Sequence, residues 1–549
     1  MRLYESFITK LFSFNLIEIE LEGDIPEESE SIPIPFIQIK TKPTVWQIEK
    51  TLTHITQNNY IRCVVLKIKD LHIGLARANA IRTKIQEVRM SGVKVLTYLE
   101  GSGNAEYLIA SASDKIVIAP WSALNLIGLK AEIVFLKDAF EKYDIEPHFK
   151  SVGEFKSAVE TFTSSKMSKA HKEMLDSLLG DLFKQLATSI SQGRNKTLAG
   201  IEKIIDSGPY LPDEALKNGL IDAIGYDHDF DSEVEKLLDH QIKKIEIEKY
   251  IKLLHFKDRI RSLISIFKKD AFNIGILTDT GMITQGESQG RGRSKNIGHN
   301  TTIKALREVY KSDKIKALVY RVSSPGGSGL SSDLICSELE NLSEKIPVVV
   351  SMSDVAASGG YLIALGGNKI VTDPFTLTGS IGVFGGKINV ANFLKRFGIN
   401  IESVQKGEHA LMFSPTKGFS ETESKKIVAM MKDLYDKFIS RVSSARKLTK
   451  IKTESNAKGR VWTGSQAKEL KLIDEFGGIY DSVKIAASLA NLDMSKVIVK
   501  TVKKPKILDL STLGKSFGFA SVYDDYIDKL NMLSNEDAKT LMPFILKIK

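Results

Sequence analysis

A single serine in the second half of the chain has the setting of a nucleophile. Ser358 lies at the centre of Val348–Leu365, where an apolar, β-branched run predicts a buried strand, small residues predict a turn and a second apolar run predicts a helix. Such a turn exposes a hydroxyl and brings backbone N–H groups close to an oxygen that becomes negative during acyl transfer. Taken alone, the stretch fits an ordinary turn with an incidental serine better, so the hypothesis needs support from elsewhere in the chain.

A serine hydroxyl is a weak nucleophile until a neighbouring base takes its proton. Lys156 is a candidate base, although a lysine with its usual pKa of about 10.4 is almost fully protonated at pH 7. Burial lowers the pKa of a lysine, and the apolar neighbours Phe155, Ala158 and Val159 allow a buried site. A surface position for Lys156 is the alternative. Ser380 could orient the amine, as aspartate orients histidine in a catalytic triad, or could simply belong to a Thr-Gly-Ser turn.

The elements that must position these side chains alternate between strand and helix. Such alternation predicts βαβ units and an α/β fold with parallel sheets and interspersed helices. The expected strands are 16–21, 34–40, 62–68, 93–99, 272–277, 316–322 and 347–352, and the expected helices are 45–57, 75–91, 302–310 and 331–343.

The two halves of the chain repeat one another. Tyr107–Ala110 matches Tyr361–Ala364 at an offset of 254 residues, and Leu220–Asp222 matches Leu472–Asp474 at an offset of 252. Runs of identity at a nearly constant offset indicate a tandem duplication.

The repeat divides the chain into three parts. We expect a first copy at 1–255, a second copy at 256–500, and a basic linker with a helical tail at 501–549.

The copies differ where chemistry is possible. At the offset of 254, Ser358 corresponds to Asn104, and Lys156 corresponds to Ala410. Ser380 corresponds to a leucine in the first copy. Each copy therefore holds half of a possible site, with the base in the first copy and the nucleophile in the second.

The segment Arg321–Ser328 of the second copy contains a Pro-Gly-Gly sequence between a predicted strand and a predicted helix. Gly326 and Gly327 let the backbone approach a substrate and direct N–H groups at a developing oxyanion. The matching segment of the first copy, Lys67–Gly74, lacks Pro-Gly-Gly, so we expect the oxyanion hole in the second copy.

The sequences SSPGGS, SDVAASGGY and LTGSIGVFG, together with GEFKSAVE in the first copy, resemble the signal peptide peptidase family (SppA type, protease IV; Ser-Lys peptidase family S49) in its long, duplicated form. The resemblance implies a tandem Clp-protease and crotonase-like α/β fold. It also implies that Ser358 is the nucleophile, Lys156 the general base and Ser380 the residue that positions the lysine, with backbone N–H groups of Gly327 and Gly359 as oxyanion donors.

The family resemblance further implies an assembly and a substrate. These are a homotetramer whose active sites are shared between protomers, and digestion of cleaved signal peptides or other extended apolar peptides at a membrane. Two features depart from the family pattern: Ser323 stands where an asparagine is usual, and the customary N-terminal membrane anchor is not found. We therefore expect peripheral association with a membrane, or a cytoplasmic location if the anchor is truly absent.

Composition excludes several other classes. The net charge of +10, from 77 Lys and Arg against 67 Asp and Glu, is spread thinly and lacks the aromatic-rich basic face typical of nucleic-acid binding. The two cysteines form no CxxC motif or Cys/His cluster, so we expect no disulfide framework, no metal site and no cofactor. No run of apolar residues is long enough for a membrane span, although residues 3–12 could form a short helix that lies on a membrane or packs on the protein.

Three alternatives remain open at this point. A crotonase-like acyl-CoA enzyme would use paired backbone amides without needing Ser358, and a silent scaffold would only bind extended peptides by strand addition. A Ser-His-Asp site would need a histidine, of which His409 is the nearest in the repeat map, but its neighbour Glu408 favours a surface position.

Overall fold

The computed structural model describes residues 14–28, 42–238, 242–268, 272–290, 295–505 and 539–541 of the 549-residue chain. The apolar pattern at residues 3–12 and the strand expected at 34–40 lie outside the described residues. Among the residues described, no helix combines the length and the apolar composition needed to cross a membrane.

The first copy is built on a parallel six-stranded sheet with the strand order β6-β4-β3-β2-β1-β7. Its strands alternate with helices along the chain, and the first six residues of β2 are all buried, as expected when helices cover both faces. The strands are β1 (Leu16–Asp24), β2 (Cys63–His72), β3 (Lys94–Leu99), β4 (Lys115–Ile118), β6 (Ala223–Ile224) and β7 (Lys244–Glu246).

The second copy is built on an eight-stranded sheet that is parallel except where β15 meets β17. The strands are β8 (Phe272–Thr280), β11 (Ile315–Ser324), β13 (Val348–Ala357), β14 (Lys369–Thr372), β15 (Leu377–Gly379), β17 (Val461–Thr463), β18 (Glu475–Phe476) and β19 (Val497–Thr501). The predicted α/β class with parallel sheets is therefore confirmed.

A third sheet joins the copies. Its strand order is β10-β9-β12-β20-β16-β5, and β5 of the first copy runs antiparallel to β16 of the second. The strands are β5 (Glu146–Val152), β9 (Met282–Thr284), β10 (Asn296–Gly298), β12 (Gly326–Ser328), β16 (Val383–Asn389) and β20 (Lys539–Leu541). The three described residues of the tail thus form a strand, where the sequence suggested a helix.

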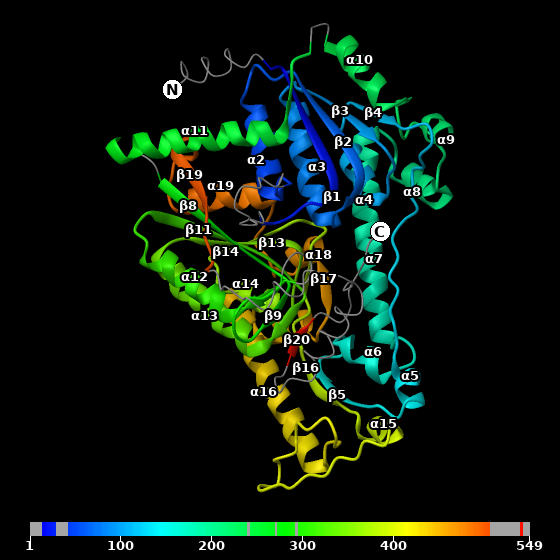
Figure 1. The fold of residues 1–549 in the computed structure, drawn as a ribbon, viewed down its shortest axis with the longest axis vertical. Helices are drawn as coiled ribbons and strands as arrows, with labels where there is room; N and C mark the ends of the chain where they lie inside the picture. Colours follow the sequence, from blue (N-terminus) through cyan, green and yellow to red (C-terminus); the bar gives the residue numbers. More distant parts are fainter. Residues whose placement is uncertain are drawn as a thin grey trace.

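Helices cover the sheets and join the two halves (Figure 1). The helices of the first half are α2 (Val45–Thr56), α3 (Leu75–Met90), α4 (Asn104–Ala110), α5 (Lys137–Lys142), α6 (Glu160–Thr163), α7 (Lys169–Arg194), α8 (Leu198–Ser207), α9 (Pro212–Lys217), α10 (Asp227–Leu238) and α11 (Ile247–Lys268). Those of the second half are α12 (His299–Lys311), α13 (Gly329–Lys345), α14 (Gly359–Ala364), α15 (Ala391–Arg396), α16 (Glu421–Arg446), α17 (Lys450–Asn456), α18 (Gly464–Glu469) and α19 (Ile479–Leu489). The predicted boundary between residues 255 and 256 falls within α11.

Equivalent side chains make equivalent bonds in the two copies. The Tyr107 hydroxyl donates to the carbonyl oxygen of Leu220 at 2.6 Å, and the Tyr361 hydroxyl donates to that of Leu472 at 2.8 Å. An arginine at the end of α7 and another at the end of α16 each bind the aspartate 28 residues further on. Because both sequence and contacts repeat, the two halves are copies of one fold.

A buried network of charges holds the copies together. Arg321 of β11 forms a 2.9 Å ion pair with Glu27, and Arg77 of α3 binds Asp354 of β13. The Arg321 guanidinium is among the groups that hold the pKa of Glu27 below its ordinary value, although burial opposes this. Removing one partner would leave an uncompensated buried charge, so this network fixes how the two sheets face one another.

Glu49, on α2 where the two copies meet, has an environment that is less favourable for a charged carboxylate. One carboxylate oxygen accepts a 2.9 Å hydrogen bond from the backbone N–H of Tyr480, whereas the other has no hydrogen-bond partner. Burial raises the pKa of Glu49 to about 7. The folded chain therefore binds more protons than the unfolded chain between the ordinary glutamate pKa and about 7, and stability falls as the pH rises through this window.

We predict that Glu49→Gln stabilises the protein above pH 7. A pKa displaced from 4.5 to about 7 corresponds to a gain in the free energy of unfolding of about 3 kcal/mol at most. The gain should vanish near pH 4, because the Glu49 carboxyl is then neutral like the amide that replaces it. Urea unfolding at pH 8 and pH 4.5 measures this, with exposed Glu469→Gln as the control. An equal effect of Glu49→Gln at both pH values would contradict the prediction.

Candidate active site

Ser358 occupies a strained turn between β13 and α14. Its backbone has φ 55° and ψ −114°, a conformation that residues other than glycine rarely adopt. Two backbone bonds hold the turn: the N–H of Ser358 donates to the carbonyl oxygen of Gly379 at 2.7 Å, and its own carbonyl accepts from Leu362 at 2.9 Å. The strand-turn-helix expected around Ser358 is thus present, and strain stored at such a turn is typical of functional positions.

The register of the sheets brings Lys156 and Ser380 to Ser358. Ala357 pairs with Gly379, so Ser358 and Ser380 follow neighbouring strand ends. Val152 pairs with Val383, so the chain that leaves β5 toward Lys156 passes beside the chain that enters β16 from Ser380. The meeting of the three residues is a consequence of pairing across the copies.

The Lys156 amine contacts both serines within one chain. Its Nζ lies 2.8 Å from Ser358 Oγ and 3.0 Å from Ser380 Oγ, and it also contacts the carbonyl oxygen of Ser380 at 3.1 Å. All three side chains are buried. The three polar partners of Nζ are neutral, and no ion pair with Lys156 is present among the described residues.

Burial lowers the pKa of Lys156 well below the ordinary lysine value, because the ammonium loses its hydration. A neutral amine at this place can accept a proton from a hydroxyl. Because Lys156 is desolvated and no carboxylate of the described chain stabilises its ammonium form, its amine can act as a base.

The three glycines expected at an oxyanion hole lie next to this turn, but they are not equivalent. Gly359 opens α14 immediately after Ser358, and the strand formed by Gly326 and Gly327 packs against α14. The N–H of Gly326 donates to Ser324 Oγ at 3.1 Å, so this group already has a partner. Gly327 has φ 154°, and a Cβ there would lie 2.0 Å from the carbonyl oxygen of Ile283. The close packing explains the need for glycine at 327.

The chain's own β20 lies beside this glycine strand. It runs antiparallel to β12, with Gly327 opposite Thr540, and it also pairs with β16 through Lys539 and Phe384. The same short strand contacts α14. The edges of β12 and β16 next to the Ser358 turn can thus accept an extended backbone between them.

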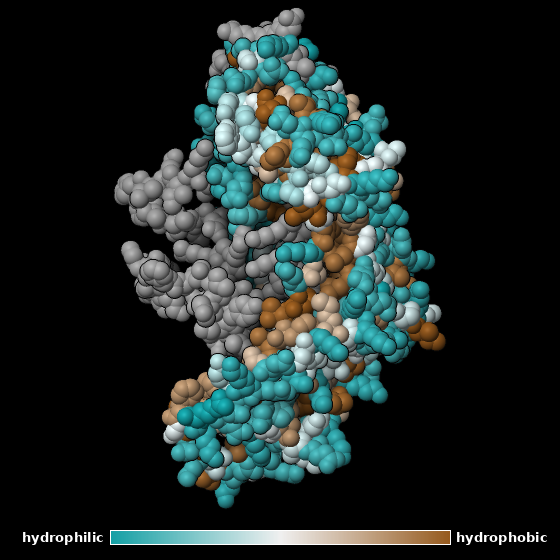
Figure 2. Space-filling view, turned by 90° about the vertical axis from the view of Figure 1, so that its right-hand side faces the viewer, coloured by the Kyte–Doolittle hydropathy of each residue, from teal (hydrophilic) through white to brown (hydrophobic). Residues whose placement is uncertain are grey.

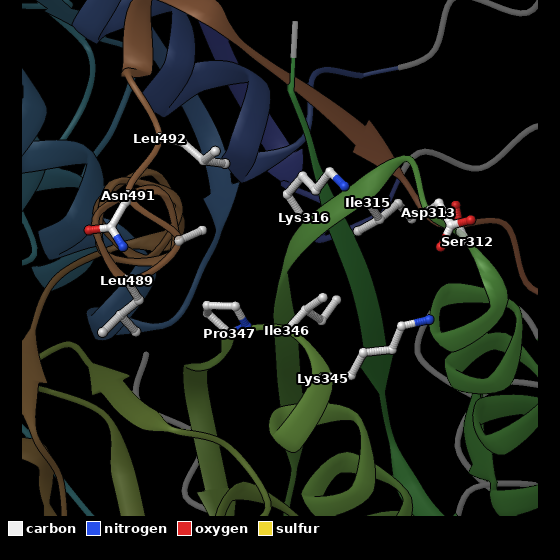
Figure 3. Close-up of a pocket in the computed structure, with 11 residues that line it drawn as sticks. Ser312, Asp313, Ile315, Lys316, Lys345, Ile346, Pro347, Leu489, Asn491 and Leu492 are labelled. Atoms are coloured by element: carbon white, nitrogen blue, oxygen red, sulfur yellow. The ribbon is translucent and has the colours of Figure 1, made fainter.

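Two other features do not belong to this site. His409 lies 3.8 Å from Glu423 in a turn of the segment 407–412, and it makes no contact with Ser358. A surface pocket of about 360 Å³ is lined by Ile315, Pro347 and Leu489 among others (Figure 3). This pocket lies at the start of β11 and β13, whereas Ser358 follows the end of β13.

The segment 458–460 is not among the residues that the sequence predicts for the site, but it contacts both Lys156 and the Ser380 turn. Arg460 accepts a 2.7 Å bond from the N–H of Ser380 through its carbonyl oxygen, and Lys458 accepts one of 2.8 Å from the N–H of Phe155. One signal was available: at the offset of 252 this segment aligns with Asp206–Gly208, so it is another place where the copies differ.

Comparisons with known proteins match this organisation. The model of peptidase family S49 matches residues 87–241 and 340–493, once in each copy. The chain is 30% identical over 486 residues to the chloroplast serine protease SPPA of Arabidopsis thaliana, covering 88% of this chain and 70% of that protein. It is 33% identical over 417 residues to protease 4 of Salmonella typhi, covering 74% of this chain and 66% of that protein.

A shorter match reaches a chain of Enterococcus faecium described as a signal peptide peptidase of the SppA type, at 31% identity over 210 residues, 38% of this chain and 59% of that one. Among solved structures, a stomatin-specific membrane protease of Pyrococcus horikoshii aligns with a TM-score of 0.27 at 16% identity, over 44% of this chain and 98% of that one. ClpP1 of Listeria monocytogenes aligns with a TM-score of 0.24 at 16% identity, over 38% of this chain and 94% of that one.

The duplicated α/β fold and its sequence relatives define the class of this protein as a serine peptidase. The chain belongs to peptidase family S49, with one family domain matched in each copy. It spans 66% of the length of the Salmonella relative.

Proposed function

We propose that this chain is a Ser-Lys endopeptidase that cleaves extended apolar peptides, including cleaved signal peptides, through an acyl-enzyme. The observation that carries the proposal is the buried 2.8 Å contact between Lys156 Nζ and Ser358 Oγ, with no carboxylate bound to the amine in the described chain. Ser358 is the nucleophile, Lys156 the general base, and Ser380 the residue that orients the amine.

In the acylation step, the neutral Lys156 amine takes the proton of the Ser358 hydroxyl while Oγ attacks the peptide carbonyl carbon. The resulting oxyanion accepts hydrogen bonds from backbone N–H groups of Gly327 and Gly359, with Gly326 completing the loop. When the tetrahedral intermediate collapses, the C–N bond breaks and the Lys156 ammonium returns the proton to the leaving amine. Water then attacks the ester with Lys156 again as the base, which releases the acid and restores the serine.

Substrate binding by strand addition is supported by the position of β20. A peptide between β12 and β16 would satisfy its backbone groups on both sides, and successive side chains would point to opposite faces. The carbonyl next to Gly327 would lie beside the Ser358 turn. Signal peptides suit this mode because they are short and apolar, and the Enterococcus relative is named for them.

The same geometry predicts competition between the tail and a substrate. A chain that ends at residue 538 lacks β20, so we expect a KM for an apolar peptide at least about threefold lower, with kcat nearly unchanged. Steady-state cleavage of a quenched fluorescent peptide measures both constants. A chain ending at residue 545 keeps β20 and serves as the control, and equal KM values for the two chains would contradict the prediction.

A homotetramer is proposed as the assembly, with association at a membrane surface. Large apolar side chains are exposed in the segment that follows α15, at Phe397, Ile399, Ile401 and Val404. Helix α15 itself lies near the lower end of the molecule in Figure 1. Figure 2 also shows hydrophobic residues gathered at mid-height on one side of the molecule, between more hydrophilic upper and lower ends. Exposed apolar groups of this kind favour contact with another chain. Light scattering of the purified protein measures the number of protomers.

A serine-directed phosphonate tests the chemical proposal. We expect one labelled serine, mapped by mass spectrometry to the peptide that contains Ser358, and no labelling in Ser358→Ala. The control Ser482→Ala removes another buried hydroxyl, on α19, and should label normally. Labelling that survives Ser358→Ala would overturn the proposal and favour an acyl-CoA enzyme or a peptide-binding scaffold instead.

A further inference from the structure

The segment Lys458–Arg460 lies between the two halves of the proposed site and bonds to both. The Lys458 carbonyl oxygen accepts from Phe155 at 2.8 Å, directly before Lys156, and the Arg460 carbonyl oxygen accepts from Ser380 at 2.7 Å. Between them, the N–H of Gly459 donates to the carbonyl oxygen of Ile381 at 2.8 Å. Three consecutive residues thus connect the lysine loop of the first copy to the serine turn of the second.

Glycine is required where these loops meet. Gly459 has φ +81°, and a Cβ there would lie 2.6 Å from both the Cβ and the backbone nitrogen of Lys156. Gly153 and Gly382 approach the same place from two other segments of the chain: their added Cβ atoms would lie 2.6 Å from the Lys458 carbonyl carbon and 2.9 Å from the Gly459 Cα, respectively. Real Cβ atoms do not approach backbone so closely, so any side chain at 459 must displace Lys156 or the segment itself.

The Arg460 side chain holds the segment against both copies. Its guanidinium lies 4.7 Å from the ring centre of Phe155 and 4.6 Å from that of Trp462, and it forms a 2.7 Å ion pair with Glu173 of α7. The contacts with Glu173 and Trp462 hold the segment without involving the Lys156 side chain, as a positioning element requires.

The first copy keeps the strand pairing but not this segment. Tyr210 there exchanges backbone hydrogen bonds with Leu124, as β17 pairs with β15 in the second copy. The equivalent of Lys458–Arg460 is Asp206–Gly208, beside Leu126 instead of a serine. The Lys-Gly-Arg sequence thus occurs only in the copy that carries Ser358.

We infer that Gly459 is a positioning residue for the Lys156 base: its missing side chain lets Lys458–Arg460 set the distance between the Lys156 amine and the hydroxyls of Ser358 and Ser380. Gly459 does not touch the reacting atoms. It acts through the backbone of Lys156, whose N–H donates a 3.0 Å hydrogen bond to the carbonyl oxygen of Gly153. The inference rests on the proposed Ser-Lys function.

Gly459→Ala tests the inference through the pH profile of kcat. We expect kcat near pH 7 to fall about 10- to 100-fold with KM changed less than twofold, because a displacement of the base by a fraction of an ångström to 1 Å affects chemistry more than binding. An amine moved out of its buried position regains a higher pKa. The rise of activity with pH should therefore move to higher pH, and part of the lost activity should return there, which a general loss of stability would not produce.

Matched glycine variants separate the contact from backbone strain. Gly92, which follows α3, has φ +90° and no heavy atom within 4 Å of an added Cβ, so Gly92→Ala carries comparable strain without the clash and should behave as wild type. Gly382→Ala meets Gly459 at 2.9 Å and should give a smaller shift of the same sign. If thermal unfolding shows that Gly459→Ala does not fold, Gly382→Ala and Gly153→Ala decide the question.

The outcomes distinguish this inference from the function on which it rests. If Lys156→Ala is inactive and folded Gly459→Ala has an unchanged pH profile, the positioning role alone is overturned. If Gly459→Ala does not fold, unchanged pH profiles in both folded Gly382→Ala and folded Gly153→Ala have the same meaning. Normal activity of Lys156→Ala overturns the Ser-Lys function itself. Phosphonate labelling of the folded variants, followed over the same pH range, gives an independent reading of the base.

Discussion

Lys156→Met should reduce kcat by about 10³-fold or more at pH 7 while the protein stays folded. Among the described residues, the amine is the one group within hydrogen-bonding distance of Ser358 Oγ that can take its proton, and loss of a general base typically costs 10²- to 10⁴-fold. Cleavage of a quenched apolar peptide measures the loss. Lys150→Met, an exposed lysine on neighbouring β5, is the matched control and should keep wild-type activity.

The pH dependence of the wild type has a defined sign. Lys156 must be neutral to act, and burial lowers its pKa, so activity should rise with pH through that lowered pKa and be lost below it. Between the lowered pKa and the usual value of about 10.4, the unfolded chain binds more protons than the folded chain, so Lys156 makes stability rise with pH. Lys156→Met should therefore stabilise the protein most at low pH. A destabilised Lys156→Met protein at every pH would contradict this.

A mixing experiment separates two possible arrangements of the site. Lys156 and Ser358 meet within one chain at 2.8 Å, so an inactive Ser358→Ala subunit and an inactive Lys156→Met subunit should not restore activity when combined. The family resemblance had suggested sites shared between protomers. Recovery of a substantial fraction of wild-type activity after mixing and reassembly would show that the base crosses to a neighbouring chain.

Ser358→Ala should remove peptide cleavage almost completely, by at least about 10⁴-fold in kcat, because no acyl-enzyme can form. In the proposed binding mode the peptide pairs its backbone with β12 and β16 and does not need the Ser358 hydroxyl, so the Kd for a labelled apolar peptide should change less than threefold. Fluorescence anisotropy measures the binding. Ser482→Ala serves again as the control, and residual cleavage above about 1% in Ser358→Ala would identify another nucleophile.

Many strands and helices could be predicted because each depends on the apolar pattern of its own segment. The strand expected at 93–99 is β3, Lys94–Leu99, and the helix expected at 75–91 is α3, Leu75–Met90. Both follow from apolar periodicity within one segment. The third sheet could not be predicted in this way, because β5 and β16 are separated by more than 200 residues and pair only through tertiary contacts.

The candidate site was accessible from the sequence because the chain is duplicated. The differences between Ser358 and Asn104 and between Lys156 and Ala410 singled out chemically able residues without any geometry. The burial of Lys156 and the short contact with Ser358 could not be known, since its local neighbours Phe155 and Ala158 suit a surface turn equally well.

The sequence alone determined the residue types, the parallel α/β architecture and which copy holds which half of the candidate site, because these depend on local pattern and on comparison between repeats. Only the tertiary structure decided that Lys156 meets Ser358 in the same chain, that Arg321 is an ion-pair partner of Glu27, and that Gly459 packs on Lys156. The physical reason is that the burial of Lys156, its pKa and its distance from Ser358 depend on segments remote in sequence. The register of β5 against β16 brings these segments together.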